Sequence, residues 1–396
     1  MENPKERLVT SISTAELERR WKAARETMKE NGIDFLLMRN DEEFFGGYVR
    51  WFTDIPARHS YPFTVIFPVD DGMTTITSSP LAPADPYPKE WAVRGVKRRL
   101  GAPYYPSLYY TSPYDAELAV EALKEKRGAT VGLVGRATLH LGFYEHLIRE
   151  LPGFTFVDAT DKIDQIKVIK SPEEIALIKG TAKIQDEALE QVGRMIRPGV
   201  RDLDIYAEAH RAVAVRGSER CQVLISSYTP GNPVDFQQRH FMNRVIREGD
   251  YATVLIEGNG PGGFYTEIAR TFVLGESSPE LEEVFGNVLE AQQSTLDMLK
   301  PGTHPKDIWD AHNALMDEMG YPPVGRMYAH GEGYDLVERP AIRYDEPMKI
   351  EAGMNIAVHP SGKTEHIWLT ICDNYLVTET GVGTCLHKTP KEIITL

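Results

Sequence analysis

A helix start at Ser171 divides the sequence into two parts that differ in their pattern of apolar residues. Ser171 suits the N-cap position, Pro172 suits the first helical position, and Glu174 follows three residues after the cap. A chain of 396 residues also exceeds the ~250–300 residues at which a single hydrophobic core stops growing. We therefore predict two domains, 1–165 and 166–396, of which the second begins with this helix.

The first part alternates helical and strand patterns. Apolar residues between Leu17 and Met28 recur at three- and four-residue spacing, which predicts an amphipathic helix over 14–31. Short apolar runs separated by turn residues follow, and this alternation is typical of an α/β domain. The expected strands are 33–38, 63–67, 73–77 and 131–134, and the expected later helices are 115–126 and 140–151.

The second part combines long helices with separate strands. The helix that begins at Ser171 is expected to run to Met195, and a second long helix is expected over 279–299. Helices on the faces of antiparallel strands are typical of an α+β domain. The expected strands are 252–257, 269–274, 355–359 and 368–377.

The formal charge of −14 excludes several classes of partner. A protein that binds nucleic acid needs a basic surface, so we expect no nucleic acid and no anionic membrane. The longest apolar runs, such as 252–256, are far shorter than the ~20 residues that span a bilayer. Residues 1–10 are charged and lack the apolar stretch of a signal peptide. We therefore expect a cytoplasmic protein.

Four segments of the second part follow one another in a recognisable order. They are 249–272, which contains Glu257 and Glu267; 329–340, which contains His-Gly-x-Gly from His330; 353–360; and 372–381. Together they resemble the motifs of the creatinase/aminopeptidase P family, the M24 or pita-bread family. The first part is similar to the family's N-terminal domain. The resemblance implies a homodimer whose subunit has an α/β creatinase-type N-terminal domain followed by an α+β pita-bread C-terminal domain.

The sequence departs from this family at the metal ligands. Peptidases of the family hold two divalent ions with two Asp, one His and two Glu. Because a His and a Cys stand where carboxylates bridge the two ions, the resemblance implies that this dinuclear centre is absent. Read position by position, the ligands correspond to Ile256 or Glu257, Glu267, His330, His359 and Cys372.

Creatinase, a family member that works without metal, is then the closest guide to the chemistry. It implies a metal-independent hydrolase or lyase that needs no cofactor and cleaves a C–N, C–S or C–C bond in a small carboxylated substrate. His and Glu side chains are suited to acid–base catalysis of this kind. We expect His330 or His359 as the general base and Glu267 as its partner carboxylate. Glu257, Cys372 and Asp373 complete the expected catalytic group.

Substrate contacts are also implied by the resemblance. Arg343 and Arg58 correspond to arginines that bind the substrate carboxylate in creatinase, the second of them across the dimer. Arginine suits this role because its planar fork donates two parallel hydrogen bonds. His240 lies near the stretch where creatinase has its catalytic base. Tyr265 and Trp51 are the remaining expected contacts.

Two alternatives stay open at this point. Glu267, His330 and His359 form a set of two His and one carboxylate, which binds a single Zn, Mn or Fe ion. Such a centre predicts a metal-dependent hydrolase or a peptidase that cleaves Xaa-Pro bonds. The second alternative is a pita-bread module that binds peptides without catalysing a reaction.

Overall fold

The computed structural model describes residues 10–79 and 93–396, and these divide into two compact units. One unit spans Ser11–Lys167 and the other Val168–Leu396, to which Thr10 also belongs. Residues 1–9, which make up most of the region 1–10 considered for a signal peptide, lie outside the described residues. Each unit has its own sheets and core, and the limits 1–165 and 166–396 remain our proposal for the domains.

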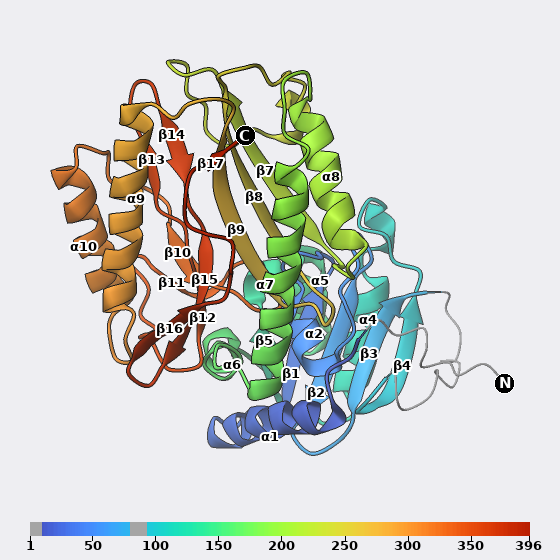
Figure 1. Ribbon diagram of the computed structural model, residues 1–396. Coiled ribbons are helices and arrows are strands. Elements are labelled where there is room, and N and C mark those ends of the chain that lie inside the picture. The colour runs from blue at the N-terminus through green and yellow to red at the C-terminus, as the bar shows by residue number, and fades with distance from the viewer. Residues whose placement is uncertain (1–9, 80–92) are drawn as a thin grey trace. The chain divides into compact units, whose positions relative to one another are not determined.

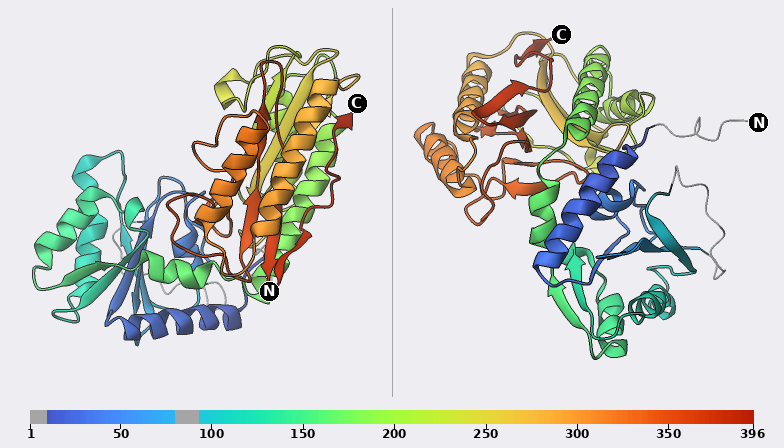
Figure 2. Two further views of the ribbon diagram at one scale, coloured as in Figure 1. Left: turned by 90° about the vertical axis from the view of Figure 1, so that its left-hand side faces the viewer. Right: turned by 90° about the horizontal axis from the view of Figure 1, so that it is seen from below.

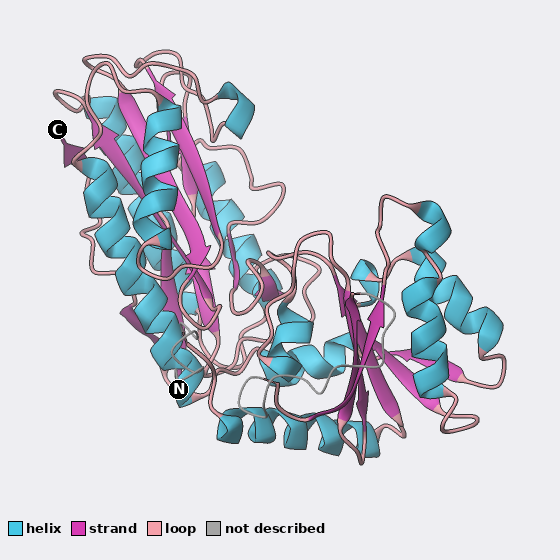
Figure 3. Ribbon diagram, turned by 90° about the vertical axis from the view of Figure 1, so that its right-hand side faces the viewer, coloured by secondary structure: helices cyan, strands magenta, loops and turns pink. Residues whose placement is uncertain are grey.

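The N-terminal unit is built on a six-stranded sheet with the order β4-β3-β2-β1-β5-β6. Helices lie on both faces of this sheet (Figure 3). The central strand β1 pairs antiparallel with β2 and parallel with β5. The strands are β1 (Phe35–Asn40), β2 (Phe63–Pro68), β3 (Met73–Ser78), β4 (Val96–Ala102), β5 (Thr130–Val134) and β6 (Thr155–Asp158). The α-helices are α1 (Thr14–Glu30), α2 (Gly47–Thr53), α4 (Tyr114–Leu123), α5 (Leu141–Glu150) and α6 (Thr160–Lys167).

The C-terminal unit contains two larger antiparallel sheets and the short pair β13-β14. Helices α7 and α8 cover the sheet β17-β9-β8-β7, whereas α9 and α10 pack on the side of β12, β14 and β15 (Figures 1 and 2). The helices are α7 (Pro172–Gly193), α8 (Asp202–Ala214), α9 (Pro279–Met298) and α10 (Pro305–Glu318). The strands of the first sheet are β7 (Cys221–Tyr228), β8 (Tyr251–Asn259), β9 (Tyr265–Val273) and β17 (Ile394–Thr395). The others are β10 (Ala329–Gly331), β11 (Glu338–Ala341), β12 (Asn355–Val358), β13 (Ser361–Lys363), β14 (Trp368–Thr370), β15 (Asp373–Thr378) and β16 (Gly381–Cys385).

The expected start of α7 is confirmed in detail. The Ser171 hydroxyl accepts a hydrogen bond from the Glu174 amide, and the Glu174 carboxylate accepts one from the Ser171 amide. This reciprocal pair is a capping box, and it satisfies two amides that the helix itself leaves unpaired. Helix α7 thereby begins at the point where the sequence pattern changes.

The two larger sheets of the C-terminal unit meet at Ala269 and Cys372. The Ala269 amide donates to the Cys372 carbonyl at 3.2 Å, and the Cys372 amide donates to the Ala269 carbonyl at 3.4 Å. Every residue of β8 and β9 is buried. This junction brings the middle of β9 close to the start of β15, and the candidate site lies around it.

Candidate metal centre

Two carboxylates lie side by side on the buried strands β8 and β9. Glu257 and Glu267 are direct partners in the antiparallel register. Residues that face each other across two antiparallel strands project from the same face of the sheet. Both side chains are almost completely buried, so the sheet places two acidic groups in the interior of the C-terminal unit.

Two histidines come from the other large sheet. His330 is the middle residue of β10, which pairs antiparallel with β12, and His359 follows the last residue of β12. The His359 amide donates to the Tyr328 carbonyl at 2.8 Å, which extends the pairing past the end of the strand. The two imidazole rings therefore lie with their centroids 5.2 Å apart.

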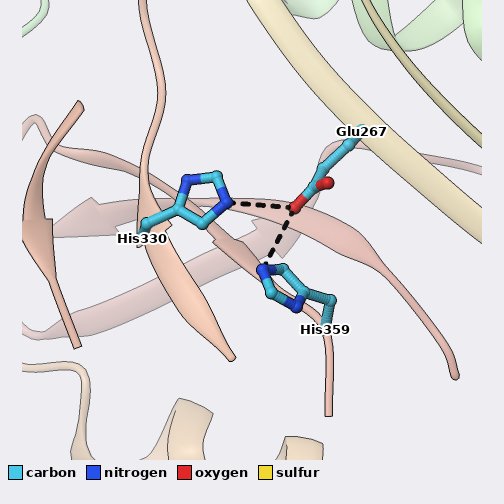
Figure 4. A group of neighbouring side chains, drawn as sticks. All are labelled: Glu267, His330 and His359. Atoms are coloured by element: carbon cyan, nitrogen blue, oxygen red, sulfur yellow. Dashed lines mark ion pairs between the residues drawn. The ribbon is translucent and has the colours of Figure 1, made fainter. Parts of the chain in front are cut away.

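The two histidines converge on one oxygen of Glu267 (Figure 4). Glu267 Oε1 lies 3.6 Å from His330 Nε2 and 3.7 Å from His359 Nε2. No hydrogen-bond partner for Oε1 is found among the described residues, although the atom is buried. A buried carboxylate oxygen without a partner is costly, so this arrangement calls for a positive charge.

The tautomer of His330 leaves a lone pair for such a charge. Its Nδ1 lies 3.0 Å from the Gly331 carbonyl oxygen. A carbonyl oxygen can only accept, so Nδ1 carries the hydrogen and Nε2 is an acceptor facing Glu267. Metal-binding histidines are commonly oriented by a hydrogen bond of this kind.

The pKa values favour neutral imidazoles at the site. Burial lowers the pKa of His330 to about 4, and burial together with the nearby His330 lowers the pKa of His359 to about 3. A general base works best when its pKa lies near the operating pH. The role of general base, expected for one of these histidines, stays a prediction, and their lowered pKa values do not favour it. Neutral imidazoles are instead the form that binds metal ions.

Cys372 supports Glu267 from the side of the junction between the sheets. Its side chain is fully buried, and burial raises the pKa of the thiol well above its usual value. The thiol therefore keeps its hydrogen and donates it to the carboxyl group of Glu267. Burial raises the pKa of Glu267 to about 7, and this hydrogen bond acts in the opposite direction. Cys372 thus holds the carboxylate in place, which differs from the direct catalytic role expected for it.

Asp373 belongs to a different group of side chains. Its carboxylate forms a buried ion pair with Arg270, with Arg270 Nη2 at 2.7 Å from Oδ1. His387 Nδ1 lies 3.7 Å from the same oxygen, and the Lys391 ammonium lies 4.0 Å from Oδ2. The positive charges of Arg270 and Lys391 already compensate the charge of Asp373, whereas burial lowers the pKa of His387 to about 4. These contacts favour a structural role for Asp373, and its expected catalytic role stays a prediction.

Glu332 and Asn374 are site residues that the sequence analysis missed. The Asn374 side chain accepts a hydrogen bond from the Glu267 amide at 2.8 Å and donates one to Glu332 Oε2. Glu332 is fully buried, and its Oε1 has no hydrogen-bond partner among the described residues. Burial and the nearby Glu267 and Glu257 raise its pKa well above the usual value. The sequence signal that could have identified Glu332 is its position between two glycines.

Arg326 is a further residue that the sequence analysis missed. It lies four residues before His330 and is exposed, and its guanidinium forms no hydrogen bond or ion pair with any described residue. Its positive charge opposes the burial that raises the pKa values of Glu257 and Glu267, and it adds to the lowering of the pKa values of His330 and His359. Arg326 is therefore a cation without a partner among the described residues, and its field reaches these four groups.

Arg343, His240 and Arg58 are three of the residues that the sequence analysis expects to contact the substrate. Arg343 is half-buried and forms a bidentate pair with Asp345 at 2.8 and 2.9 Å. His240 is exposed in a short turn and contacts the ring of Phe241. Arg58 lies in the N-terminal unit, where it lines a small hollow.

The two other expected contacts, Trp51 and Tyr265, have buried side chains. Trp51 is 1% exposed and belongs to the core of the N-terminal unit. Tyr265 is 0% exposed, and its amide donates to the Gly333 carbonyl at 2.7 Å. Their burial does not favour the substrate contacts expected of them, which stay predictions.

The residues present fit one divalent cation. Glu267, His330 and His359 each offer one ligand atom, and these atoms lie within 4.8 Å of one another. Two imidazole nitrogens and one carboxylate oxygen are a donor set for Fe, Mn or Zn. A second cluster of donors, at Asp373, Cys385 and His387, does not fit a cation because Arg270 occupies it.

Comparison with known proteins agrees with this geometry. The sequence profile of metallopeptidase family M24 matches residues 176–379, and that of the creatinase/prolidase N-terminal domain matches residues 20–169. An Xaa-Pro dipeptidase of Pyrococcus horikoshii is 26% identical and covers 74% of this chain and 85% of its own. An ectoine hydrolase of Halomonas elongata is 28% identical and covers 73% of this chain and 77% of its own. The crystal structure of an X-Pro aminopeptidase from Thermotoga maritima has a TM-score of 0.78 at 20% identity, over 95% of this chain and 99% of that one.

These matches confirm the expected fold and correct the expected chemistry. The creatinase-type N-terminal domain and the pita-bread C-terminal domain are both confirmed. The metal-independent hydrolase or lyase without a cofactor is wrong, because the matching family is one of metallopeptidases and its similar members include Xaa-Pro dipeptidases. The names of the relatives support a hydrolase. Every helix in the described part of the chain is too short or too polar to cross a bilayer.

Proposed function

The chain belongs to metallopeptidase family M24, and from this membership we propose that it is a hydrolase that depends on one divalent cation. The proposed substrate is a short peptide with an Xaa-Pro bond, the class named for its relatives from two Pyrococcus species. We keep a homodimer in the cytoplasm as part of the proposal. A small substrate with a free carboxylate is also retained, since a dipeptide is such a molecule.

One observation carries the proposal. Glu267 Oε1 is buried without a hydrogen-bond partner among the described residues and lies 3.6 and 3.7 Å from the Nε2 atoms of His330 and His359. Neither distance is short enough for a hydrogen bond. Three ligand atoms that surround a point without bonding to one another are what a cation requires.

The side chains of the site then have separate tasks. Glu267, His330 and His359 would hold the cation, which when bound supplies Lewis acidity to a carbonyl group. Cys372 and Asn374 keep the Glu267 carboxyl group and its backbone in place. Such supporting groups orient metal ligands. His359 is the least buried of the three ligands, with 19% of its side chain exposed, so the site is reachable from solvent on its side.

Arg326 is the proposed partner of the substrate carboxylate. It is free of ion pairs with described residues, whereas Arg343 is paired with Asp345. An arginine without a partner can donate two parallel hydrogen bonds to a carboxylate. This assignment replaces Arg343 as the preferred residue for this role.

Metal titration of the purified chain tests the proposal. The protein is treated with a chelator, dialysed, and titrated with Mn²⁺ and with Zn²⁺ while bound metal and hydrolysis of alanyl-proline are measured. We expect one bound ion per chain and activity that rises with its binding. His330→Ala and Glu267→Gln should abolish both, whereas His240→Ala, an exposed histidine outside the triad, should bind metal normally. Full activity of the metal-free protein would refute the proposal, as would two ions per chain.

A further inference from the structure

A polar hollow lies at the edge of the sheet formed by β7, β8, β9 and β17. Its volume is about 380 Å³, and it opens beside the last residues of β7 and the first turn of α8. β7 is an edge strand of this sheet. The lining residues that matter for a ligand are Asp202, Ser227, Asn232, Arg244 and Arg247.

The hollow is separate from the metal centre. Tyr228, which lines the hollow, pairs with Tyr251 at one end of β8. Glu257 lies six residues further along the same strand. At about 3.3 Å per residue, the two places are roughly 20 Å apart along β8.

Asp202 brings an uncompensated acidic group to the hollow. Its side chain is buried, with 2% exposure, and its Oδ1 has no hydrogen-bond partner among the described residues. Burial raises the pKa of Asp202, while a hydrogen bond from Ser227 and the charge of Arg244 only partly oppose this. The carboxylate therefore lacks a donor that a cationic group would supply.

The two arginines of the hollow differ in what they can offer. Arg244 is committed to Asp250, with Arg244 Nη1 at 2.7 Å from Asp250 Oδ2, and to the hydroxyl groups of Ser227 and Thr229. Arg247 donates its backbone amide to Asp250. The Arg247 guanidinium is exposed and has no hydrogen bond or ion pair to any described residue. It is therefore the cation that remains available in the hollow.

We propose that this hollow binds a small α-amino acid, with the ammonium group on Asp202 and the carboxylate group on Arg247. A ligand with both charges satisfies both unpartnered groups. Asn232, whose amide is exposed, adds a donor and an acceptor for the same ligand. A phosphate ion would be repelled by Asp202, and a divalent cation would be repelled by Arg247 and Arg244. The site lies outside the proposed hydrolytic centre and does not depend on its activity.

Calorimetric titration of the full-length, metal-free protein tests this proposal. Removal of metal prevents the amino group of the probe from binding a cation at Glu267. The probes are glycine, L-alanine, L-serine and L-proline, and the controls are methylamine and acetate, which carry one charge each. We expect at least one of the four amino acids to bind and neither control to bind at the same concentration.

Two variants with matched controls locate the binding. Asp202→Asn and Arg247→Met should each weaken binding at least tenfold. Asp204→Asn, in the same helical turn, and Arg197→Met, an exposed arginine outside the hollow, should leave it unchanged. If Asp202→Asn does not fold, the affinity of the Arg247→Met variant, changed at an exposed position, is the deciding measurement. Absence of binding by all four amino acids would overturn the proposal, and so would unchanged affinity in a folded variant of either residue.

Discussion

Single side chains of the C-terminal unit decide how it responds to protons and metal ions. His330 and His312 are buried and His359 is half-buried, and the pKa of each is lowered, chiefly by removal from water. Of the three, His312 is the one outside the proposed ligand set. Its ring stacks on Tyr328, with centroids 3.5 Å apart, and neither ring nitrogen has a hydrogen-bond partner among the described residues.

His312 is predicted to destabilise the protein in acid. Burial lowers its pKa to about 4 from 6.5, so the unfolded chain binds more protons between these two pH values. Stability is therefore fully present above pH 6.5 and falls as the pH drops towards 4, by roughly 3 kcal/mol in total. Urea unfolding of His312→Phe, which keeps an aromatic ring but cannot titrate, should show a weaker pH dependence in this range. The exposed His366→Phe serves as control, and an identical loss of stability in all three proteins would contradict the assignment.

Cys372 is predicted to act on metal affinity through Glu267. Cys372→Ala removes the hydrogen-bond donor and should weaken metal binding about tenfold, in the range typical of groups that orient ligands. Cys372→Ser keeps a donor and should restore most of the affinity. Metal titration monitors both variants, with Cys221→Ala as a control cysteine. Equal affinity of the alanine and serine variants would show that the thiol does not position Glu267.

At the scale of elements, the site depends on contacts that join strands and helices of the C-terminal unit. β9 and β15 are joined by the Arg270–Asp373 ion pair, whose side chains are 1% and 0% exposed. α7 is held at its start by the capping box of Ser171 and Glu174. Both interactions lie outside the metal ligands, so their removal tests the scaffold alone.

Removal of Arg270 is predicted to destabilise the C-terminal unit strongly. Arg270→Leu leaves Asp373 buried without its main partner, which costs about 3–5 kcal/mol. Arg270→Leu combined with Asp373→Leu removes both charges and should recover part of this loss. Denaturant unfolding of the two variants measures the difference. If the double variant were no more stable than the single one, the loss would come from packing and not from the uncompensated charge.

The capping box makes a smaller, local contribution. Ser171→Ala should lower the free energy of unfolding by about 1 kcal/mol, because the Glu174 amide loses its acceptor. Ser218→Ala, at a half-buried position outside any helix, is the matched control. Chemical denaturation, followed by a signal from the C-terminal unit, measures the change in the free energy of unfolding. An equal change in the control variant would contradict a stabilising role for the capping box.

At the scale of the whole molecule, the chain consists of two units, each with its own core. The proposed cation binds residues of the C-terminal unit alone. A ligand stabilises the state that binds it, by about 2.7 kcal/mol when its concentration is a hundred times Kd. The two units should therefore respond differently to metal.

Hydrogen exchange is predicted to show this difference directly. On addition of Mn²⁺ to the metal-free protein, amides of β9, β10 and β12 should exchange more slowly, because they carry or flank the three ligands. Amides of β1 and β2 in the N-terminal unit should keep their rates. Glu267→Gln, treated in the same way, should show no slowing in either unit. Equal slowing in both units of the unaltered protein would contradict binding at the triad.

The sequence by itself determined the local features of this protein. Helices α1 and α7 follow from apolar spacing and from the Ser171 cap, and these signals need only residues within a few turns of each other. The order of the motifs also identified the family and its two domains. β4 was missed because the run Val96–Ala102 carries three consecutive basic residues and is mostly half-exposed, so it lacks the apolar pattern of a buried strand.

Only the tertiary structure decided what the site is. Glu267 and His330 lie on β9 and β10, and His359 directly follows β12. Their convergence depends on the pairing of β10 with β12 and on the Ala269–Cys372 junction. Counting lost ligands along the sequence suggested a centre without metal. It could not show that Glu267 Oε1 lacks a partner, because burial and the absence of hydrogen bonds are set by contacts between residues far apart in the chain.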